Sequence, residues 1–463
     1  MTVNQNQDCT GASTTFELCE MENNQGPFKI LQYSFVFRDS KASGDLQATW
    51  LKSSFDRLTQ LYPIMLGHRE RVGNRNIVVV SAEDLQKEKF IVHQERGMTV
   101  DDFDKIKYCR DLWPPAMATL LKDRTSDIEC FSFVVVVCFR DGYLVSLSVS
   151  HLLSDVSGMI TLLHQWGSIA RQVLEGKSRV EEMLPDREID FDHARFWQRL
   201  AAHPPEVHPH VAYTRQRNYG NANELMAKAM EFINSGVRGV GGDTLATRVL
   251  HVSAARIAKI SERFNNGKQP LHGVQIFYAI FWQRYVATVQ QLCQEEMDIY
   301  NEPIFLNMIC NVRRVTDTPN HVGNAVTPVY VRSTLDDLLT KPIIETAYLI
   351  KSFINSVTPG AAAYFATVFN DPSDPFVPTV IYEQRKLVSG LTISNASRLP
   401  FLDIDLGCGK PTSVLCGTVP TEGLTTWVPN ANGGADIYLG AKDNTYELLK
   451  SDPVLSKYVD FMN

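Results

Sequence analysis

Two apolar segments on either side of Asp141-Gly142 constrain the fold of this chain more than any other part of the sequence. Residues 132–139 form an apolar, largely β-branched run, which is typical of a buried strand. The Asp-Gly pair that follows is a strong signal for a tight turn. Apart from Leu144, residues 143–150 then alternate, with aromatic and aliphatic side chains on one face and serines on the other. The pattern predicts a strand, a turn and a second strand.

The second predicted strand runs directly into a histidine. His151 continues the apolar face of the strand, and a helix with an apolar stripe begins a few residues later. Ser154 or Asp155 is the expected N-cap of this helix, because either side chain can accept hydrogen bonds from N–H groups of the first turn. At a strand-to-helix corner a side chain can reach a cavity while its backbone stays rigid. His151 is therefore the first candidate for a functional side chain.

A histidine at this corner suits the removal of a proton from an alcohol or amine that attacks a thioester. Its ordinary pKa is near neutrality, so the imidazole can be unprotonated at working pH. The acceptor itself is then the nucleophile, and the sequence has no G-x-S-x-G elbow that would supply another. Asp155 is either the second member of a catalytic dyad or the residue that holds the corner, by capping the helix or by pairing with an arginine. The alternative for His151 is a buried histidine with a satisfied hydrogen bond.

Length and charge narrow the class of protein. At roughly 100–200 residues per domain, a chain of 463 residues suggests two or three domains, and we expect two. The net charge is −7, and no basic stripe is present, so nucleic acid is not an expected partner. The nine cysteines form no C-x-x-C pair, which predicts neither a metal site nor a disulfide framework but reduced thiols. The N-terminus is polar and no apolar run reaches about 18 residues, so we expect a cytoplasmic protein without a membrane span.

Periodicity suggests the remaining elements and the division of the chain. Residues 184–210 are rich in proline, histidine and charge and show no sustained period, so they are interpreted as a crossover. The expected domains are residues 1–190, with the His151 corner, and residues 222–463, joined by a crossover loop over 191–221. Further elements are expected as helices over 45–62, 272–289 and 335–356, strands over 76–81 and 304–310, and several strands between 379 and 439.

Five segments give the chain a wider resemblance. They are residues 61–67 (LYPIMLG), 131–171 with His151 and Asp155, 277–282 (FYAIFW), Arg313 with 323–326 (GNAV), and 398–411 (RLPFLDIDLGCGKP). In this order and spacing the chain resembles the BAHD acyltransferase superfamily, particularly its fungal branch. The resemblance implies an α/β fold of two similar chloramphenicol-acetyltransferase-like domains, with mixed β-sheets and an active-site channel between them.

The resemblance also implies a function. It is that of an acyltransferase for groups other than aminoacyl groups, which moves an acetyl or other short acyl group from coenzyme A (CoA) to an alcohol or amine of a small, secondary metabolite. The resemblance further implies that acyl-CoA is the co-substrate, that no cofactor or metal is permanently bound, and that the protein is a monomer. It implies that His151 is the general base and that Asp155 is structural. Asp405, Gly407 and Gly409 are structural as well, with Asp405 expected to pair with Arg313.

Two features of the sequence depart from the family pattern. Val156 follows the motif aspartate where a glycine is usual, and the glycine comes later, at Gly158. The usual Phe-Gly-Trp-Gly is Leu406-Gly407-Cys408-Gly409 here, so this loop must pack without two large aromatic side chains. Lys410 is the one neighbour in sequence that would activate Cys408, which argues against a nucleophilic cysteine.

Donors for an oxyanion or contacts to the acceptor are expected on the strand before this loop, at Thr392, Ser394 or Asn395. A polar edge strand without such a role is the alternative. Two other functions stay open at this point. One is a condensation-like enzyme that uses a carrier-protein thioester, although Ser150 stands where such enzymes usually carry a first histidine. The other is a non-catalytic CoA- or ligand-binding member of the fold, suggested by the altered loop.

Overall fold

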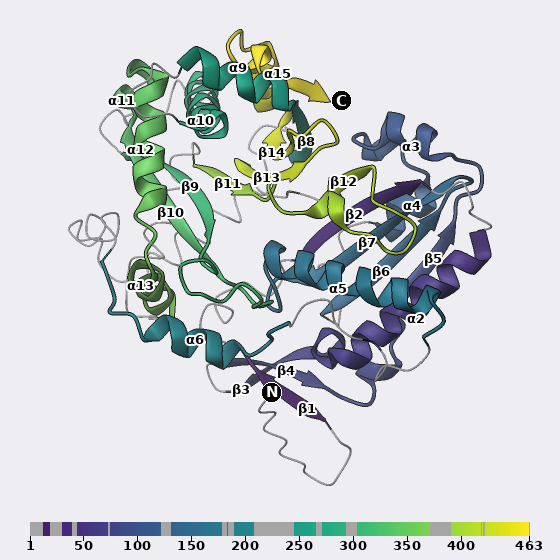
Figure 1. Ribbon diagram of the computed structural model, residues 1–463. Coiled ribbons are helices and arrows are strands. Elements are labelled where there is room, and N and C mark those ends of the chain that lie inside the picture. The colour runs from purple at the N-terminus through teal and green to yellow at the C-terminus, as the bar shows by residue number, and fades with distance from the viewer. Residues whose placement is uncertain are drawn as a thin grey trace. The chain divides into compact units, whose positions relative to one another are not determined.

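The computed structural model describes residues 13–18, 30–38, 44–72, 75–121, 131–177, 183, 189–207, 245–264, 271–292, 303–370, 390–417, 419 and 422–462. The chain forms two compact units. Unit 1 consists of Met1–Arg199, Asp317–Ala325 and Leu399–Thr418, and unit 2 consists of Leu200–Thr316, Val326–Arg398 and Val419–Asn463. Each unit contains its own large sheet (Figure 1). The helix α6 (His193–Ala201) includes the boundary between them.

Unit 1 is built on a five-stranded sheet in the order β12-β2-β7-β6-β5. Its strands are β2 (Ile30–Arg38), β5 (Phe90–Gln94), β6 (Ser132–Cys138), β7 (Gly142–Ser150) and β12 (Ser413–Cys416). The pair β5–β6 is parallel and the other pairs are antiparallel, so the sheet is mixed. A separate three-stranded sheet has the order β1-β4-β3 and consists of β1 (Thr14–Glu17), β3 (His68–Val72) and β4 (Arg75–Val80).

Helices explain why the central strands of unit 1 are apolar. Besides α6, the α-helices described in this unit are α2 (Gly44–Leu61), α3 (Val100–Ile106), α4 (Pro115–Leu120) and α5 (Val156–Leu174). All seven residues of β6 are buried, as expected for a strand covered on both faces. Side chains of α3 and α4 share one apolar cluster with Phe133 and Val135 of β6. On α5, Trp166 packs edge-on against Phe55 of α2, with ring centroids 5.4 Å apart. The predicted strand–turn–strand and the following helix are confirmed.

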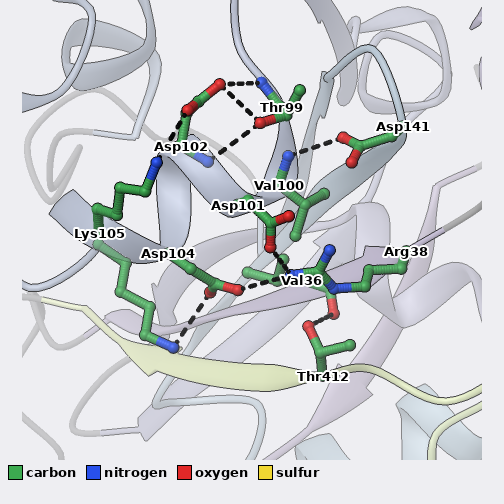
Figure 2. A network of polar contacts seen from close by, with 11 residues as sticks. Val36, Arg38, Thr99, Val100, Asp101, Asp102, Asp104, Lys105, Asp141 and Thr412 are labelled. Atoms are coloured by element: carbon green, nitrogen blue, oxygen red, sulfur yellow. Dashed lines mark hydrogen bonds and ion pairs between the residues drawn. The ribbon is translucent and has the colours of Figure 1, made fainter.

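The turn between β6 and β7 is tied to the start of α3. Figure 2 shows Asp141 pointing at the backbone of Val100, whose N–H donates to Asp141 Oδ1 at 2.7 Å. Beside it, Arg38 at the end of β2 forms ion pairs with Asp101 and, at 3.2 Å, with Asp104. These pairs are exposed, so each contributes little to stability. The aspartate of the Asp-Gly turn therefore makes a specific contact as well as favouring the turn.

Unit 2 is built on a seven-stranded sheet in the order β10-β9-β11-β13-β14-β8-β15. Its strands are β8 (Leu245–Val252), β9 (Pro303–Asn311), β10 (Val326–Thr334), β11 (Leu391–Asn395), β13 (Leu424–Pro429), β14 (Ala435–Lys442) and β15 (Asp460–Met462). β11 runs parallel to both of its neighbours, β9 and β13, while the other pairs are antiparallel. Mixed sheets with helices confirm the predicted α/β class. The predicted channel between domains stays a prediction.

The helices described in unit 2 pack into two apolar clusters. They are α9 (Ala254–Phe264), α10 (Gly273–Leu292), α11 (Leu335–Thr340), α12 (Ile343–Asn355), α13 (Pro359–Asn370) and α15 (Asp443–Ser451). Side chains of α13 cluster with Phe305 and Tyr330, and those of the other helices share the larger core. α10 contributes many side chains to the larger core, and its Phe277 and Phe281 pack against Trp427 of β13. The single helix expected over 335–356 is wrong, because Pro342 separates α11 from α12. A proline disfavours helical backbone in the residue before it, and Lys341 is extended, with ψ of 148°.

The two units are not consecutive along the chain. Residues 1–190 and 222–463 were the predicted domains, but two segments of the second half belong to unit 1. The strand β12 pairs with β2, so that Val414 lies opposite Phe35. A bridge between Asp190 and His321 adds the second segment. Of the predicted crossover over 191–221, residues 208–221 lie outside the described residues. Among the described helices, none has the length and apolar character that a membrane crossing requires.

Candidate active site

His151 lies in the turn that connects β7 to α5. The sheet pairing of β7 ends at Ser150, opposite Ile30. The carbonyl of Ser150 then accepts hydrogen bonds from the N–H groups of Leu153 at 2.9 Å and Ser154 at 3.3 Å, which closes a tight turn. His151 is half-buried within this turn. The histidine therefore occupies the strand-to-helix corner that the sequence predicted.

Asp155 is the N-cap of α5, one of the two residues predicted for that position. Its backbone is extended, and its Oδ1 accepts a hydrogen bond from the Gly158 N–H at 2.9 Å. Its Oδ2 accepts a second bond, from the Ala325 N–H at 2.8 Å. The residue is 2% exposed, so both bonds are made away from water. Asp155 thus joins the start of α5 to Ala325, in another segment of unit 1.

The segment Asp317–Ala325 meets the corner at two further points. The Ser154 hydroxyl donates to the carbonyl of Val322 at 2.6 Å. The side-chain Nδ2 of Asn324 donates to the carbonyl of His151, also at 2.6 Å. Asn324 is completely buried. Its Gly-Asn-Ala-Val motif was visible in the sequence, but its contact with the histidine corner was not predicted, because the two segments lie 173 positions apart.

Gly158 explains why a glycine is needed in the first turn of α5. A Cβ atom at this position would lie 1.8 Å from the carbonyl oxygen of Val322 and 2.3 Å from the Ser154 hydroxyl. The close approach of Asp317–Ala325 therefore requires a residue without a side chain here. The displaced glycine noted in the sequence has this packing role, three residues after Asp155.

The loop around Asp405 is organised by its own side chain. Asp405 Oδ1 accepts hydrogen bonds from the N–H groups of Gly407 at 2.7 Å and Gly409 at 3.0 Å. Both glycines have positive φ, 94° and 96°, a backbone region that favours glycine. The carbonyl of Asp405 accepts a bond from Arg171 Nη1 of α5 at 3.0 Å. These contacts give Asp405 and its two glycines a structural role in unit 1; any part in the site stays a prediction.

The altered Leu-Gly-Cys-Gly sequence packs against side chains from other elements. Leu406 is fully buried. A Cβ on Gly407 would lie 2.7 Å from the Trp50 ring and 2.6 Å from Leu174, so these two side chains occupy the space beside the loop. The Tyr143 hydroxyl donates a hydrogen bond to the Cys408 sulfur. An aromatic side chain from α2, outside the motif, therefore packs beside this loop.

Arg313 belongs to unit 2, directly after β9. It is buried, and its backbone N–H donates to Asn311 Oδ1 at 2.9 Å. Asp405 belongs to unit 1. The predicted pairing of Arg313 with Asp405 stays a prediction.

The strand β11 carries the three expected oxyanion or acceptor contacts. Leu391 and Ile393 point into the core of unit 2, so Thr392 and Ser394 lie on the opposite face and are half-buried. Asn395 is used locally. Its Oδ1 accepts from the backbone N–H of Ser397 at 2.8 Å, and its Nδ2 donates to the Tyr278 hydroxyl. Burial raises the pKa of Tyr278 to about 12, so this hydroxyl remains protonated at neutral pH.

A cavity of about 650 Å³ lies within unit 2. One side of α9 from Ala254 to Glu262, the start of α10 and the turn between β13 and β14 contribute to its walls. Its charged and titratable lining residues are Arg398, His272 and Glu262. Burial lowers the pKa of His272, and the positive charge of Arg398 lowers it further. Arg398 is the first residue of the RLPF segment, so the motif was recognised from sequence, but the cavity beside it was not.

Comparisons with known sequences all find transferases. The model of the Transferase family matches residues 13–450. The chain is 21% identical to putrescine hydroxycinnamoyltransferase 3 of Oryza sativa subsp. japonica, over 73% of this chain and 72% of that one. It is 22% identical to stemmadenine O-acetyltransferase of Catharanthus roseus, over 71% of this chain and 66% of that one.

Solved structures show the same fold at low identity. TRI101 of F. sporotrichioides, complexed with coenzyme A and T-2, has a TM-score of 0.70 and 15% identity, over 97% of this chain and 100% of that one. Vinorine synthase has a TM-score of 0.66 and 14% identity, over 98% of this chain and 95% of that one. At these identities the likeness concerns the fold, and it agrees with the predicted two-domain α/β architecture.

Proposed function

This chain belongs to the Transferase family, and from that membership we propose that it transfers an acyl group from CoA to an alcohol or amine of a small molecule. His151 is the general base in this proposal. The observation that carries it is the rigid corner at His151, which hydrogen bonds from Asn324 and to Asp155 hold between β7 and α5. A general base must be positioned as well as unprotonated, and such a corner provides the positioning.

The proposed reaction needs no covalent enzyme intermediate. The His151 imidazole takes the proton from the acceptor O–H or N–H while that oxygen or nitrogen bonds to the thioester carbon. The carbonyl electron pair moves to oxygen and forms a tetrahedral oxyanion, for which the Thr392 and Ser394 hydroxyls remain candidate donors. When the oxyanion collapses, the C–S bond breaks, and the leaving CoA sulfur receives the proton from the imidazolium.

The cavity in unit 2 supports a proposal for the polar end of CoA. Its volume, about 650 Å³, is within the range of about 300–1,000 Å³ that small-ligand pockets occupy. We infer that the Arg398 guanidinium pairs with a phosphate of CoA, because its fork geometry suits phosphate oxygens. The Gly273 N–H at the start of α10 would add to this site, since Gly273 lines the cavity, whereas the Val274 N–H already donates to His272 Nδ1 at 3.3 Å. The Glu262 carboxylate also lines the cavity and would repel a phosphate, so the attraction of Arg398 must exceed this repulsion.

The two named relatives differ in the acyl group of their names, which is hydroxycinnamoyl in one and acetyl in the other. We infer a short acyl donor, such as the acetyl group in the name of the stemmadenine enzyme, and a secondary metabolite as acceptor. We further infer that the protein works as a cytoplasmic monomer, with no nucleic-acid or membrane partner and with acyl-CoA as a co-substrate that is not permanently bound. The net charge of −7 supports the absence of a nucleic-acid partner.

Release of CoA tests the proposal directly. Purified protein is incubated with acetyl-CoA and longer acyl-CoAs, with pooled alcohols and amines. Free CoA is followed by mass spectrometry, because the nine cysteines would react with a thiol dye. His151→Ala should lower the rate about 10²–10⁴-fold, the usual contribution of a general base. His203→Ala, which changes a histidine outside the corner, is the matched control and should retain the wild-type rate.

The alternatives predict other outcomes. If His151→Ala, shown to be folded by circular dichroism, releases CoA as fast as wild type, His151 is not the base. If acyl-CoA binds but is never turned over with any acceptor, the chain is a non-catalytic binding protein. If a carrier-protein thioester is used and free acyl-CoA is not, the condensation-like reaction is correct.

A further inference from the structure

We propose that Asn324 is a positioning residue that sets the orientation of His151, an inference that rests on the proposed function. The Asn324 Nδ2 donates to the His151 carbonyl at 2.6 Å, and the Asn324 side chain is completely buried. Both residues belong to unit 1, although they are 173 positions apart.

The backbone of His151 lies outside both regular ladders that flank it. Sheet pairing stops at Ser150, and the Met159 N–H bonds to the Asp155 carbonyl at 2.9 Å in the first turn of α5. Two side chains hold the peptide plane after His151: the Leu152 N–H donates to Ser150 Oγ at 3.3 Å, and the His151 carbonyl accepts from Asn324 Nδ2 at 2.6 Å. Holding this carbonyl restrains the carbonyl carbon of His151. With the His151 nitrogen set by the preceding strand, the position of that carbon fixes φ, and φ determines where the Cα–Cβ bond points. A bond to this carbonyl consequently controls the direction of the imidazole.

Three of the hydrogen bonds between Asp317–Ala325 and the corner involve different corner residues. The bond to Val322 comes from Ser154, and the bond from Ala325 ends on Asp155. The bond from Asn324 ends on His151 itself. Loss of the first two would loosen the corner as a whole. Loss of the Asn324 bond should misplace the base while Asp155 still caps α5.

The test uses two substitutions in the full-length chain. Asn324→Asp keeps the size and shape of the side chain but replaces the donating Nδ2 with an oxygen that repels the His151 carbonyl. Asn324→Ala removes the donor without adding charge, so it serves if the aspartate variant does not fold. A displacement of about 1 Å near the reacting atoms can cost about 100-fold in rate. We expect kcat to fall roughly 10- to 100-fold, with KM for acyl-CoA unchanged.

Ser54→Ala is the matched control for a loss of stability alone. The Ser54 hydroxyl accepts from Trp166 Nε1 at 2.8 Å, so its removal also leaves a buried partner unsatisfied in unit 1. It should lower the melting temperature to a similar extent and leave kcat unchanged. The pH dependence of kcat gives a second readout. In the Asn324 variants, kcat should still rise with pH as the base loses its proton, but to a lower plateau. In His151→Ala this rise of kcat with pH should disappear.

Each result has a distinct meaning. Folded Asn324 variants with wild-type kcat would overturn the inference while the proposed function stands. A fall in kcat no larger than that of Ser54→Ala at equal loss of stability would also overturn it, because the role would then be structural. If wild-type protein shows no acyl transfer, or if His151→Ala is fully active, the proposed function itself fails.

Discussion

Asp155 and Ala325 are joined by a hydrogen bond from the Ala325 N–H to Asp155 Oδ2 at 2.8 Å, across 170 positions of the chain. The other carboxylate oxygen of Asp155 accepts from Gly158. A carboxylate suits this position because it offers two accepting oxygens and carries no hydrogen at neutral pH. The motif aspartate therefore acts on the fold, and through the fold on the His151 corner.

Replacing this carboxylate with an amide should be costly. Asp155→Asn retains one accepting oxygen and turns an NH₂ group towards the other N–H donor. We expect a loss of about 1–3 kcal/mol in the free energy of unfolding, the cost of one unsatisfied buried group, measured by urea denaturation. Asp192→Asn is the control, since exposed Asp192 accepts the Arg195 N–H and its amide oxygen can still do so. Equal stability of the two variants would contradict the two-acceptor role.

Gly158→Ala should destabilise the protein although alanine favours helices. Helix propensity alone would stabilise by about 1 kcal/mol. The new Cβ would lie 1.8 Å from the Val322 carbonyl, an overlap that far outweighs this gain. Thermal unfolding should show a large drop in melting temperature or failure to fold. Gly97→Ala, whose Cβ would approach nothing nearer than 3.5 Å, should be nearly neutral, and a similar result for both would contradict the packing argument.

Gly407 and Gly409 provide an internal comparison. Both have positive φ, so alanine at either should cost about 1–2 kcal/mol from backbone strain. At Gly407 the Cβ would also overlap Trp50 and Leu174, whereas at Gly409 it would meet nothing within 4 Å. Gly407→Ala should therefore reduce the denaturation midpoint clearly more than Gly409→Ala. The reverse order would show that the Trp50 side chain does not confine this loop.

Arg398→Ala tests the proposed phosphate contact. Loss of the guanidinium from the unit 2 cavity should raise KM for acyl-CoA about 10-fold or more, as expected for a charge-assisted bond, with little change in kcat. Steady-state kinetics with dephospho-CoA thioesters would show whether the 3′-phosphate is the group recognised. Arg69→Ala, at an exposed position of β3, should leave KM unchanged. An unchanged KM for Arg398→Ala would remove the cavity from CoA binding.

His251 predicts a pH dependence of stability. Its hydrogen bond to buried Asp436, 2.8 Å from Nδ1 to Oδ1, raises the pKa of His251 above the ordinary 6.5. The charge of Asp460 also raises this pKa, while burial and Arg256 lower it. The pair should therefore stabilise the fold fully below pH 6.5, and this contribution should fade as pH rises through the folded pKa. His251→Gln should lower the melting temperature more at pH 5.5 than at pH 8.5, and equal losses would contradict the prediction.

Local patterns were sufficient to predict the elements around His151. The alternation of residues 143–150, the Asp-Gly turn and the N-cap all depend on neighbours within a few positions. The contacts of Ala325 and Asn324 with the corner could not be predicted, because backbone groups and a buried carboxamide leave no periodic signal. The cavity beside Arg398 was missed for a related reason. Its walls come from several elements that are distant in sequence.

The edge strand β12 has a consequence for how the protein is made. In unit 1, the strand beside β2 is Ser413–Cys416, and the segment that bonds to the His151 corner is Asp317–Ala325. Both come from the second half of the chain. While the ribosome is still synthesising the second half, β2 has an unpaired edge, which is a site where chains can associate wrongly. The first 199 residues therefore cannot complete their sheet until almost the whole chain has emerged. Expressing residues 1–199 alone would yield a fragment in which β2 has an unpaired edge and the His151 corner lacks its hydrogen bonds to Asp317–Ala325.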